Sequence, residues 1–295
     1  MIITDYKKVN LNNTVVALGK FQGLHKGHML LIDKIISLAK EHGYISTVFT
    51  INIPTKDKVL QLAKERFSIL EEKGVDVAVE CDFSEEFAAM TPERFVKEIL
   101  IDHLHVTCVV VGEDFRFGIN RLGDVDRLVE FGIKYGFRVI AFPKLKANGE
   151  IISASLIRTR VAEGKVDGLS DYLGRYYSVS GLVIEGKKLG RTIGFPTINL
   201  EPSKVKLLPQ NGVYETFVRV DGVDYKAITN IGQNPTVDDD QKIHIETHII
   251  DYSGDLYGHE LTIWFARKLR DEKRFNSIEE LKEQLKIDKM RVMHQ

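Results

Sequence analysis

The sequence predicts a doubly wound parallel α/β sheet domain over residues 1–175, followed by a small antiparallel β-barrel with a C-terminal helix over residues 176–295. In the first half, short apolar runs alternate with segments of helical periodicity, as in a parallel sheet with helices on both faces. In the second half, strand-like segments of alternating pattern follow one another with Gly, Asp, Asn and Pro between them. The 295 residues are enough for two separate hydrophobic cores.

The overall composition points to small-molecule partners. Forty-one basic and forty-two acidic residues leave a net charge of -1, which favours neither nucleic acid nor an anionic membrane as partner. The start has no apolar leader, and no apolar run approaches the ~20 residues that span a bilayer, so we expect a cytoplasmic protein. Cys81 and Cys108 lie in apolar segments without Cys-x-x-Cys spacing and are expected to be buried thiols. The composition does not specify an oligomeric state.

The elements of the first domain follow from its apolar periodicity. A helical pattern runs from Leu31 to Ala39, and Thr91 followed by proline predicts the start of another helix. In a parallel sheet of this kind, ligands bind beyond the carboxyl ends of the strands. The expected strands are residues 15–18, 44–50, 75–83, 108–112 and 137–143.

A glycine loop, Gly19-Lys-Phe-Gln-Gly-Leu-His-Lys-Gly-His28, comes directly after the first expected strand. His25 and His28 lie at a helix start, separated by Gly27, so both can face an anion that the helix N-terminus attracts. Imidazoles in this position can stabilise the oxygens of a phosphate under attack. The alternative is a pair of loop histidines with local hydrogen bonds, but the place after the first strand favours the phosphate site.

The elements of the second half begin with a helical segment over residues 155–174 that ends at Gly174. Ser277 and Glu280 form a capping-box pattern before a final helix that carries Leu281 and Leu285. The expected barrel strands are residues 177–184, 213–220, 225–231, 243–251 and 260–269.

Residues 186–199, Gly-Lys-Lys-Leu-Gly-Arg-Thr-Ile-Gly-Phe-Pro-Thr-Ile-Asn, form a second candidate phosphate loop. Its glycines allow close approach of the backbone or positive φ, and its cations supply counter-charge. The spacing matches neither a P-loop nor a dinucleotide-binding loop, because no Gly-Lys-Ser/Thr opens a helix here and the residues that follow look extended. A solvated hairpin is the alternative. The glycines are Gly186, Gly190 and Gly194, and the cations are Lys187, Lys188 and Arg191.

Thr197 and Asn199 follow this loop and point to the same face of an extended segment. A hydroxyl and an amide oxygen side by side suit a hard cation, which suggests a magnesium nucleotide.

His244, Glu246 and His248 share one face of an expected barrel strand. Such a His-x-Glu-x-His pattern permits a rival interpretation, a cupin-like metalloenzyme with three ligands on the strand. One strand rarely supplies a whole ligand set, so we treat this as the weaker hypothesis. Without a metal, His244 and His248 are expected to be surface residues of the barrel without chemistry.

The run Gly-Arg-Thr-Ile-Gly-Phe-Pro-Thr-Ile-Asn-Leu, residues 190–200, closely resembles the signature of riboflavin kinases. The resemblance implies that Thr197 and Asn199 hold the Mg²⁺ of ATP and that Glu246 takes the proton from the ribityl terminal hydroxyl. It implies flavin contacts in Leu269-Arg-Asp-Glu-Lys-Arg-Phe, namely Arg270, Asp271 and Phe275, for which a solvated approach to a helix is the alternative. The ATP-binding residues implied are Gly186, Lys187, Gly190, Thr192, Gly194 and Pro196.

The loop at residues 19–28 resembles the nucleotidyltransferase superfamily and, more narrowly, the adenylyltransferase domain of bacterial bifunctional riboflavin kinase/FAD synthetases. Val109-Val-Val-Gly-Glu-Asp-Phe-Arg-Phe-Gly118 and Ile152-Ser-Ala-Ser-Leu-Ile-Arg158 support this resemblance. It implies catalytic roles for His25, His28 and Arg158, ATP contacts at Gly19, Phe21, Gly27, Ser153 and Ser155, and flavin contacts at Asp114, Phe115, Arg116 and Phe117.

The first domain also departs from that family pattern. Gln22 stands where an aspartate is usual, Ala154 where a hydroxyl residue is usual, and Leu156 where arginine is frequent. Thr50-Ile-Asn-Ile-Pro-Thr replaces a Pro-His-Pro segment. These changes keep open the alternative that only the kinase domain is active.

The resemblance covers nearly the whole chain. It implies ATP-dependent phosphorylation of riboflavin to FMN by the second domain and adenylylation of FMN to FAD, with release of pyrophosphate, by the first. The implied ligands are ATP with Mg²⁺, riboflavin, FMN and FAD. A kinase with an inactive first domain, a regulator that senses flavin or nucleotide, and the metalloenzyme remain as alternatives.

Overall fold

The computed structural model describes residues 1–53, 57–186, 189–233 and 243–294. The chain divides into two compact units, Met1–Ala154 and Ser155–Gln295. The domain boundary at residues 175/176 stays a prediction. Within the described ranges, no helix is both long and apolar enough to cross a membrane.

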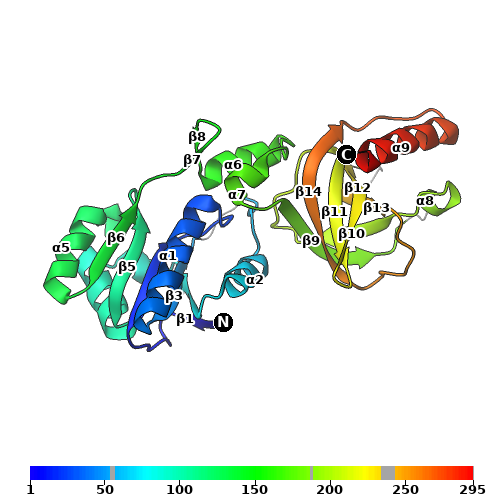
Figure 1. Ribbon diagram of the computed structural model, residues 1–295. Helices are drawn as coiled ribbons and strands as arrows, with labels where there is room; N and C mark the ends of the chain where they lie inside the picture. Colours follow the sequence, from blue (N-terminus) through cyan, green and yellow to red (C-terminus); the bar gives the residue numbers. More distant parts are fainter. Residues whose placement is uncertain (54–56, 187–188, 234–242, 295) are drawn as a thin grey trace. The chain divides into compact units, whose positions relative to one another are not determined.

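The first unit contains the expected parallel sheet (Figure 1). Six strands lie in the order β1-β4-β3-β2-β5-β6, and every neighbouring pair is parallel. All five strands expected from the sequence are present, and β1 is an additional edge strand. The bounds are β1 (Ile2–Asp5), β2 (Thr14–Gly19), β3 (Ile45–Asn52), β4 (Val77–Asp82), β5 (Val106–Gly112) and β6 (Arg138–Phe142).

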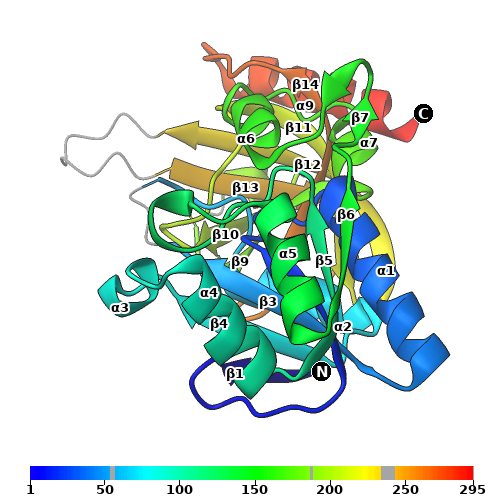
Figure 2. The same ribbon diagram turned by 90° about the vertical axis from the view of Figure 1, so that its left-hand side faces the viewer.

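Both faces of this sheet are covered, because successive side chains of a strand point to opposite faces. Val15 and Ala17 of β2 pack with α1 (Lys26–His42) and α2 (Ala63–Lys73). Val16 and Leu18 pack in a second cluster with the π-helix η1 (Phe95–His103) and α5 (Val125–Tyr135). Figure 2 shows α5 in front of the sheet. The doubly wound prediction is therefore confirmed.

Short elements complete the first unit. Thr91 caps α4, with proline at the first helical position as predicted, because its hydroxyl accepts a hydrogen bond from the Arg94 N–H at 3.2 Å. The other short elements are α3 (Glu85–Ala88), α4 (Pro92–Arg94), η2 (Ile119–Arg121), β7 (Lys146–Ala147) and β8 (Glu150–Ile151).

The second unit is a closed antiparallel barrel in the order β10-β13-β12-β11-β14-β9. It is preceded by α6 (Ala154–Ala162) and by α7 (Leu169–Leu173), which ends at Gly174 in the left-handed conformation, as expected. The barrel strands are β9 (Tyr177–Ile184), β10 (Ile198–Pro202), β11 (Gly212–Val220), β12 (Val223–Gln233), β13 (Ile243–Ile249) and β14 (Glu260–Arg270).

The barrel interior contains a row of threonine hydroxyls. Thr216 and Thr229 are joined at 2.8 Å and Thr229 and Thr247 at 2.9 Å, and all three residues are fully buried. Each buried hydroxyl thus has a hydrogen-bond partner, as burial of a polar group requires. Side chains alternate along a strand, so the positions next to these threonines point to the outer face of the barrel. On that face Val213 and Ile228 pack in a cluster with Val292 of α9 (Ile278–Met293). The outer face of the barrel is therefore partly covered by the C-terminal helix.

Helix α9 starts as predicted at Ser277, whose hydroxyl accepts a hydrogen bond from the Glu280 N–H at 3.1 Å. The Glu280 carboxylate instead accepts from the Asn276 N–H at 3.0 Å, one residue before the partner of a standard capping box. At the other end, Lys226 donates to the Val292 carbonyl at 2.8 Å and Arg267 to the Arg291 carbonyl at 3.1 Å. These cations hold carbonyls of the last turn, which lack partners within the helix.

Candidate functional site

A pocket of about 190 Å³ lies on the outer face of the barrel. It is bordered by β12, β13, the loop before β10, the segment after β14 and α9. Thr197, Glu246, Arg270 and Phe275, all predicted site residues, line it together. The full lining is Gly190, Ile193, Phe195, Thr197, Val213, Ile228, Asn230, Glu246, His248, Arg270, Glu272, Lys273, Phe275, Leu281 and Leu285.

Strand register places polar residues on both sides of Glu246. Asn199 of β10 pairs with Glu246 on one side, and Asn230 of β12 pairs with it on the other. Directly paired residues have their Cβ atoms ~5 Å apart on the same face of the sheet. The result is a row Asn199, Glu246, Asn230 across three strands. Asn230 was not assigned a role from the sequence, because the signal is the pairing of strands that are distant in the chain.

Glycine is required for a different structural reason at each of three positions in the loop at residues 186–199. A Cβ on Gly186 would lie 2.1 Å from Nδ2 of Asn199, so the Asn199 carboxamide occupies that space. A Cβ on Gly190 would lie 2.2 Å from the Phe195 carbonyl oxygen, and the Phe195 N–H donates back to the Gly190 carbonyl at 2.8 Å. Gly194 has φ +81°. The positive φ expected from the sequence occurs at Gly194, and the close approaches at Gly186 and Gly190 are to atoms of the loop itself. An approach of this backbone to a ligand stays a prediction.

This loop contains a single helical turn, α8 (Leu189–Thr192), which the sequence did not predict. A turn of four residues has no helical periodicity that a sequence could reveal. The segment after it is extended from Ile198, as expected. Thr192 and Pro196 are exposed. Lys187, Lys188 and the side chain of Arg191 lie outside the described residues.

His248 is not the surface residue that the sequence predicted. It is 8% exposed, and its Nδ1 lies 2.8 Å from the Pro196 carbonyl oxygen, next to Thr197. Burial lowers the pKa of His248, which favours the neutral ring with Nδ1–H donating to that carbonyl. The ring also contacts Phe195 edge-on, with centroids 5.3 Å apart. His248 therefore fixes the segment that carries Thr197.

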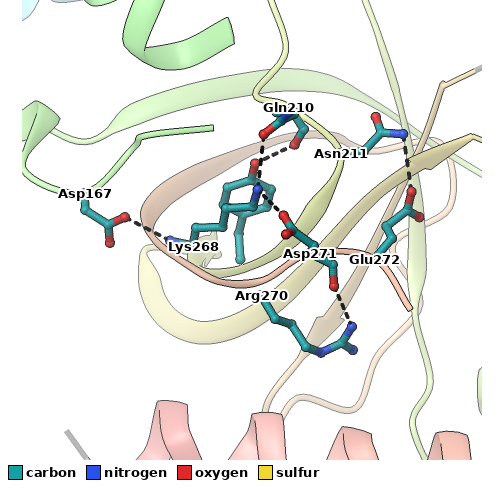
Figure 3. Close-up of polar contacts among 8 residues, drawn as sticks. Asp167, Gln210, Asn211, Lys268, Arg270, Asp271 and Glu272 are labelled. Carbon is teal, nitrogen blue, oxygen red and sulfur yellow. Dashed lines mark hydrogen bonds and ion pairs between the residues drawn. The ribbon is translucent and has the colours of Figure 1, made fainter. Parts of the chain in front are cut away.

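The three predicted flavin contacts after β14 are not in equivalent positions. Arg270 lines the pocket with Phe275, and its guanidinium carbon lies 5.9 Å from the centre of that ring. Asp271 is exposed and bonds Lys268 Nζ at 2.6 Å, outside the pocket lining (Figure 3). The hydrogen bond from Lys268 lowers the pKa of the Asp271 carboxyl. The structure thus brings Arg270 and Phe275 together and directs Asp271 toward Lys268.

In the first unit, the loop between β2 and α1 has a strained backbone. Phe21 has φ +46°, Leu24 has φ +38° and Gly23 has φ +76°. Positive φ is costly for residues other than glycine, and such strain is frequent at functional loops. Phe21 and Leu24 are both fully buried, so packing compensates for the strain. The Phe21 ring lies under Gly19, where an added Cβ would be 3.3 Å from it.

The two histidines meet at the start of α1. His25 is the N-cap residue, and its Nδ1 accepts a hydrogen bond from the His28 N–H at 3.3 Å. Because Nδ1 accepts, the proton of the neutral His25 ring is on Nε2, which can donate to a ligand. The two rings are stacked with centroids 3.7 Å apart. A Cβ on Gly27 would lie 3.2 Å from the His25 ring, so this glycine leaves room for the stack.

The carboxamide oxygen of Gln22 is buried in the same loop and accepts no hydrogen bond from the described residues. A buried acceptor of this kind usually has a protein, water or ligand partner. Gln22 is the position where the family usually has aspartate. Its acceptor character is therefore retained, although its charge is lost.

The predicted flavin loop after β5 is partly core and partly surface. Phe117 is 4% exposed and packs on Phe95, with ring centres 5.5 Å apart. Phe115 stacks on Phe117 at 5.6 Å. Asp114 is exposed and forms an ion pair with Lys144 at 3.0 Å, and Arg116 is also exposed. The structure thus leaves Asp114, Phe115 and Arg116 accessible and places Phe117 beneath them.

The predicted phosphate-binding residues Ser153, Ser155 and Arg158 do not all belong to the same unit. Ser153 belongs to the first unit, whereas Ser155 and Arg158 belong to the second, on α6. Ser155 and Arg158 are three residues apart, so they share one face of that helix. Their action on the same phosphates as His25 and His28 stays a prediction.

The metalloenzyme hypothesis receives no support from the barrel strand. His248 uses Nδ1 for the Pro196 carbonyl, and residues 1–53, 57–186, 189–233 and 243–294 contain no group of three His, Cys, Asp or Glu residues arranged to hold a metal. Glu246 has asparagines as its neighbours in register.

Comparisons with known proteins match both parts of the chain. A family model described as FAD synthetase matches residues 7–156, and one described as riboflavin kinase matches residues 173–295. Bifunctional riboflavin kinase/FMN adenylyltransferases are 35% identical in Pseudomonas fluorescens and 34% identical in Escherichia coli K12. The matches cover 93% and 94% of this chain and 90% of each relative.

A solved structure is similar over the full length of both chains. It is that of a macrolide-efflux protein from Streptococcus pneumoniae, with a TM-score of 0.91 and 28% sequence identity. The efflux name is that of the neighbour, and the similarity concerns the folds of both domains. Because models for both enzymes match, the comparisons support two activities over a kinase alone.

Proposed function

Because the chain belongs to the family of bifunctional riboflavin kinase/FMN adenylyltransferases, we propose how its residues divide two successive reactions. The C-terminal domain phosphorylates riboflavin to FMN with ATP. The N-terminal domain joins FMN to the adenylyl group of a second ATP, giving FAD and pyrophosphate. The observation that carries the assignment in the barrel is that Thr197 and Glu246 line one pocket.

In the kinase reaction, Glu246 acts as the base. The terminal hydroxyl of the ribityl chain must lose its proton as its oxygen attacks the γ-phosphorus. Glu246 is an exposed carboxylate between two asparagines, and the pocket that it lines also contains the apolar side chains of Phe275, Leu281 and Leu285. This arrangement suits a substrate with an apolar ring and a hydroxylated chain.

Mg²⁺ fits the donors beside Glu246. Thr197 offers a hydroxyl and Asn199 a carboxamide oxygen, both hard oxygen ligands. The contact with Gly186 holds the Asn199 carboxamide in place. Few protein ligands are typical of Mg²⁺ bound together with a nucleotide. When bound, the ion would neutralise charge on the phosphoryl oxygens.

The loop before β10 surrounds the triphosphate in this proposal. Backbone N–H groups at Gly186, Gly190 and Gly194 and the Thr192 hydroxyl provide donors, and the cation Lys187 provides counter-charge. Pro196, which has no N–H, offers only an apolar contact to the nucleotide. His248 holds the loop through the hydrogen bond between its Nδ1 and the Pro196 carbonyl oxygen. The task of His248 is therefore to position the loop.

In the adenylyltransferase reaction, a phosphate oxygen of FMN attacks the α-phosphorus of ATP, and pyrophosphate leaves. His25 donates from Nε2, and His28 and the N-terminus of α1 stabilise the negative oxygens. Ser153, Ser155 and Arg158 receive the pyrophosphate, and Asp114, Phe115 and Arg116 contact the flavin over the buried Phe117. The accessible positions of these loop residues support the assignment.

The test is a chromatographic separation of flavins after incubation with ATP and Mg²⁺. With riboflavin as substrate, we expect FMN and then FAD, and with FMN as substrate we expect FAD. If riboflavin gives only FMN and added FMN is unchanged, the first domain has no adenylyltransferase activity. Small-molecule partners and a cytoplasmic location remain our predictions.

A further inference from the structure

Arg270 takes part in two structures at once. It lines the pocket of the barrel, and it forms a bidentate ion pair with Asp288 of α9. Nε and Nη2 of Arg270 lie 3.0 and 2.8 Å from Oδ2 of Asp288. The Asp288 side chain is 0% exposed, and Gln284 Nε2 donates to its Oδ1 at 3.0 Å. A carboxylate buried to this extent has one dominant partner, the pocket arginine.

The hydrogen bonds of Arg270 can be counted against its five N–H groups. Nε and one N–H of Nη2 bind Asp288, and one N–H of Nη1 binds the Asp271 carbonyl at 3.1 Å (Figure 3). Within the described residues this leaves one N–H on Nη1 and one on Nη2. Arg270 lines the pocket, so these two N–H groups are the donors that it can offer to a ligand there.

The charge of Arg270 is already balanced by Asp288. An arginine prepared for phosphate needs its positive charge available to the anion. A neutralised guanidinium instead offers directed hydrogen bonds with little net attraction for an anion, which suits an uncharged oxygen acceptor. The surroundings agree, because Phe275, Leu281 and Leu285 supply apolar surface for a ring, and the charges of the neighbouring Glu272 and Lys273 are of opposite sign.

We propose that Asp288 is a positioning residue for flavin binding. By clamping and neutralising Arg270, it directs the two remaining donors toward the carbonyl oxygens of the flavin ring. This inference rests on the proposed kinase function of the barrel. It makes α9 part of flavin recognition, through Asp288 on one turn and through Leu281 and Leu285 on earlier turns.

The test uses the full chain with Asp288→Asn. The substitution removes the balancing charge and one carboxylate acceptor, so Arg270 loses its orientation. We expect KM for riboflavin to rise about tenfold, with kcat and KM for ATP within about twofold of the wild type. Lumiflavin, which has the ring without the ribityl chain, should lose the same factor in affinity by fluorescence quenching. Equal losses would show that the affected contact is to the ring.

Two further variants keep the test decisive. Arg270→Lys retains the charge beside Asp288 but lacks the fork of donors, so we expect the same rise in riboflavin KM, even if Asp288→Asn does not fold. Glu215→Gln is the matched control, since Glu215 pairs with Arg267 at 2.5 Å and Arg267 also binds the Arg291 carbonyl of α9. That pair lies outside the pocket lining. We expect a lower Tm and an unchanged riboflavin KM.

Three results would overturn the inference. Riboflavin KM could stay at the wild-type value in Asp288→Asn or, if that variant does not fold, in Arg270→Lys. KM for ATP could rise in place of KM for riboflavin, or Glu215→Gln could raise riboflavin KM equally. Failure of the proposed function is a different result, because the wild-type protein would then make no FMN from riboflavin. Lumiflavin and riboflavin binding can be measured in either case, since fluorescence quenching needs no turnover.

Discussion

In the barrel, the base proposed for the kinase reaction lies in regular strand register, whereas in the first domain the histidines proposed for adenylyl transfer follow a strained loop. Glu246 has its place because β13 pairs with β10 and β12. The positions of His25 and His28 depend on the loop before α1, in which Phe21 and Leu24 have positive φ. Strand pairing therefore positions Glu246 in the barrel, whereas the backbone conformation of the loop between β2 and α1 positions His25 and His28.

Glu246→Gln should produce the largest effect. Loss of a general base lowers kcat by ~10²–10⁴-fold, and the neutral amide keeps the size of the side chain. We expect riboflavin phosphorylation to fall by this factor, measured as FMN formed per minute. The same protein should convert added FMN to FAD at the wild-type rate, which is the internal control. Phosphorylation at the wild-type rate would remove Glu246 from the mechanism.

His25→Asn should affect only the first domain. Asparagine is a good N-cap residue, so the start of α1 is retained while the imidazole Nε2 donor is lost. Loss of one such donor costs ~10²-fold in rate, and we expect this decrease in FAD formation from FMN. Ser37→Ala, an exposed change on the same helix, is the control and should leave the rate unchanged. An equal decrease in kinase activity would argue against separate sites.

Gly186→Ala tests whether the barrel site tolerates backbone crowding. The new Cβ would meet Nδ2 of Asn199 at 2.1 Å, so the carboxamide must move. Misplacing a positioning group by ~1 Å costs up to ~100-fold, and we expect kinase kcat/KM for MgATP to fall by about 10- to 100-fold.

The control for this prediction is the same change in an Asn199→Ala background. Without the carboxamide there is no clash, so Gly186→Ala should add little to the loss already caused by Asn199→Ala. Additive losses would mean that Gly186 acts independently of Asn199, for example by direct approach of its backbone to ATP.

The smallest expected effect concerns His248 and is a dependence of stability on pH. Its pKa is lowered in the folded protein by burial, with Lys289 adding to the effect and the Pro196 carbonyl and Asp251 opposing it. The unfolded chain, with a pKa of ~6.5, therefore binds the proton first, and this stability is present above pH ~6.5 and lost as the pH falls below it. Folding should weaken on acidification from neutral pH.

His248→Asn should flatten this dependence. Asparagine can still donate from Nδ2 to the Pro196 carbonyl but does not titrate, so we expect ~1 kcal/mol lower stability at pH 7.5 and a smaller loss between pH 7.5 and 5.5. Urea unfolding of wild-type and variant protein at the two pH values measures both quantities. Identical losses on acidification would show that other groups cause the pH dependence.

The sequence predicted most helices and strands correctly, but it did not predict contacts between segments that are distant in sequence. Strand β9 lies where the alternating pattern predicted it. Thr91 caps the start of α4 and Gly174 caps the end of α7, as expected. Strand β1 was missed because it is a short edge strand with Ile2 and Ile3 exposed, and its pairing with β4 is distant in sequence. Local periodicity contains no information on such pairing.

The same limit applies to the site. Thr197 and Glu246 were predicted from motifs and lie in one pocket. The burial of His248 was not predicted, because alternation distinguishes the two faces of a strand but not what covers the outer one. Here the segment from Phe195 to Thr197 covers it. Asp288 was missed for the same reason, since its partner lies 18 residues earlier, on another element.

The most direct test of two independent sites in one chain is complementation. Glu246→Gln protein and His25→Asn protein are each incubated with riboflavin, ATP and Mg²⁺, alone and mixed, and FAD is measured. We predict little FAD from either variant alone, and FAD formation in the mixture, because FMN made by the second protein is adenylylated by the first. A mixture that makes no more FAD than its separate components, under conditions where the wild-type protein does, would contradict the account.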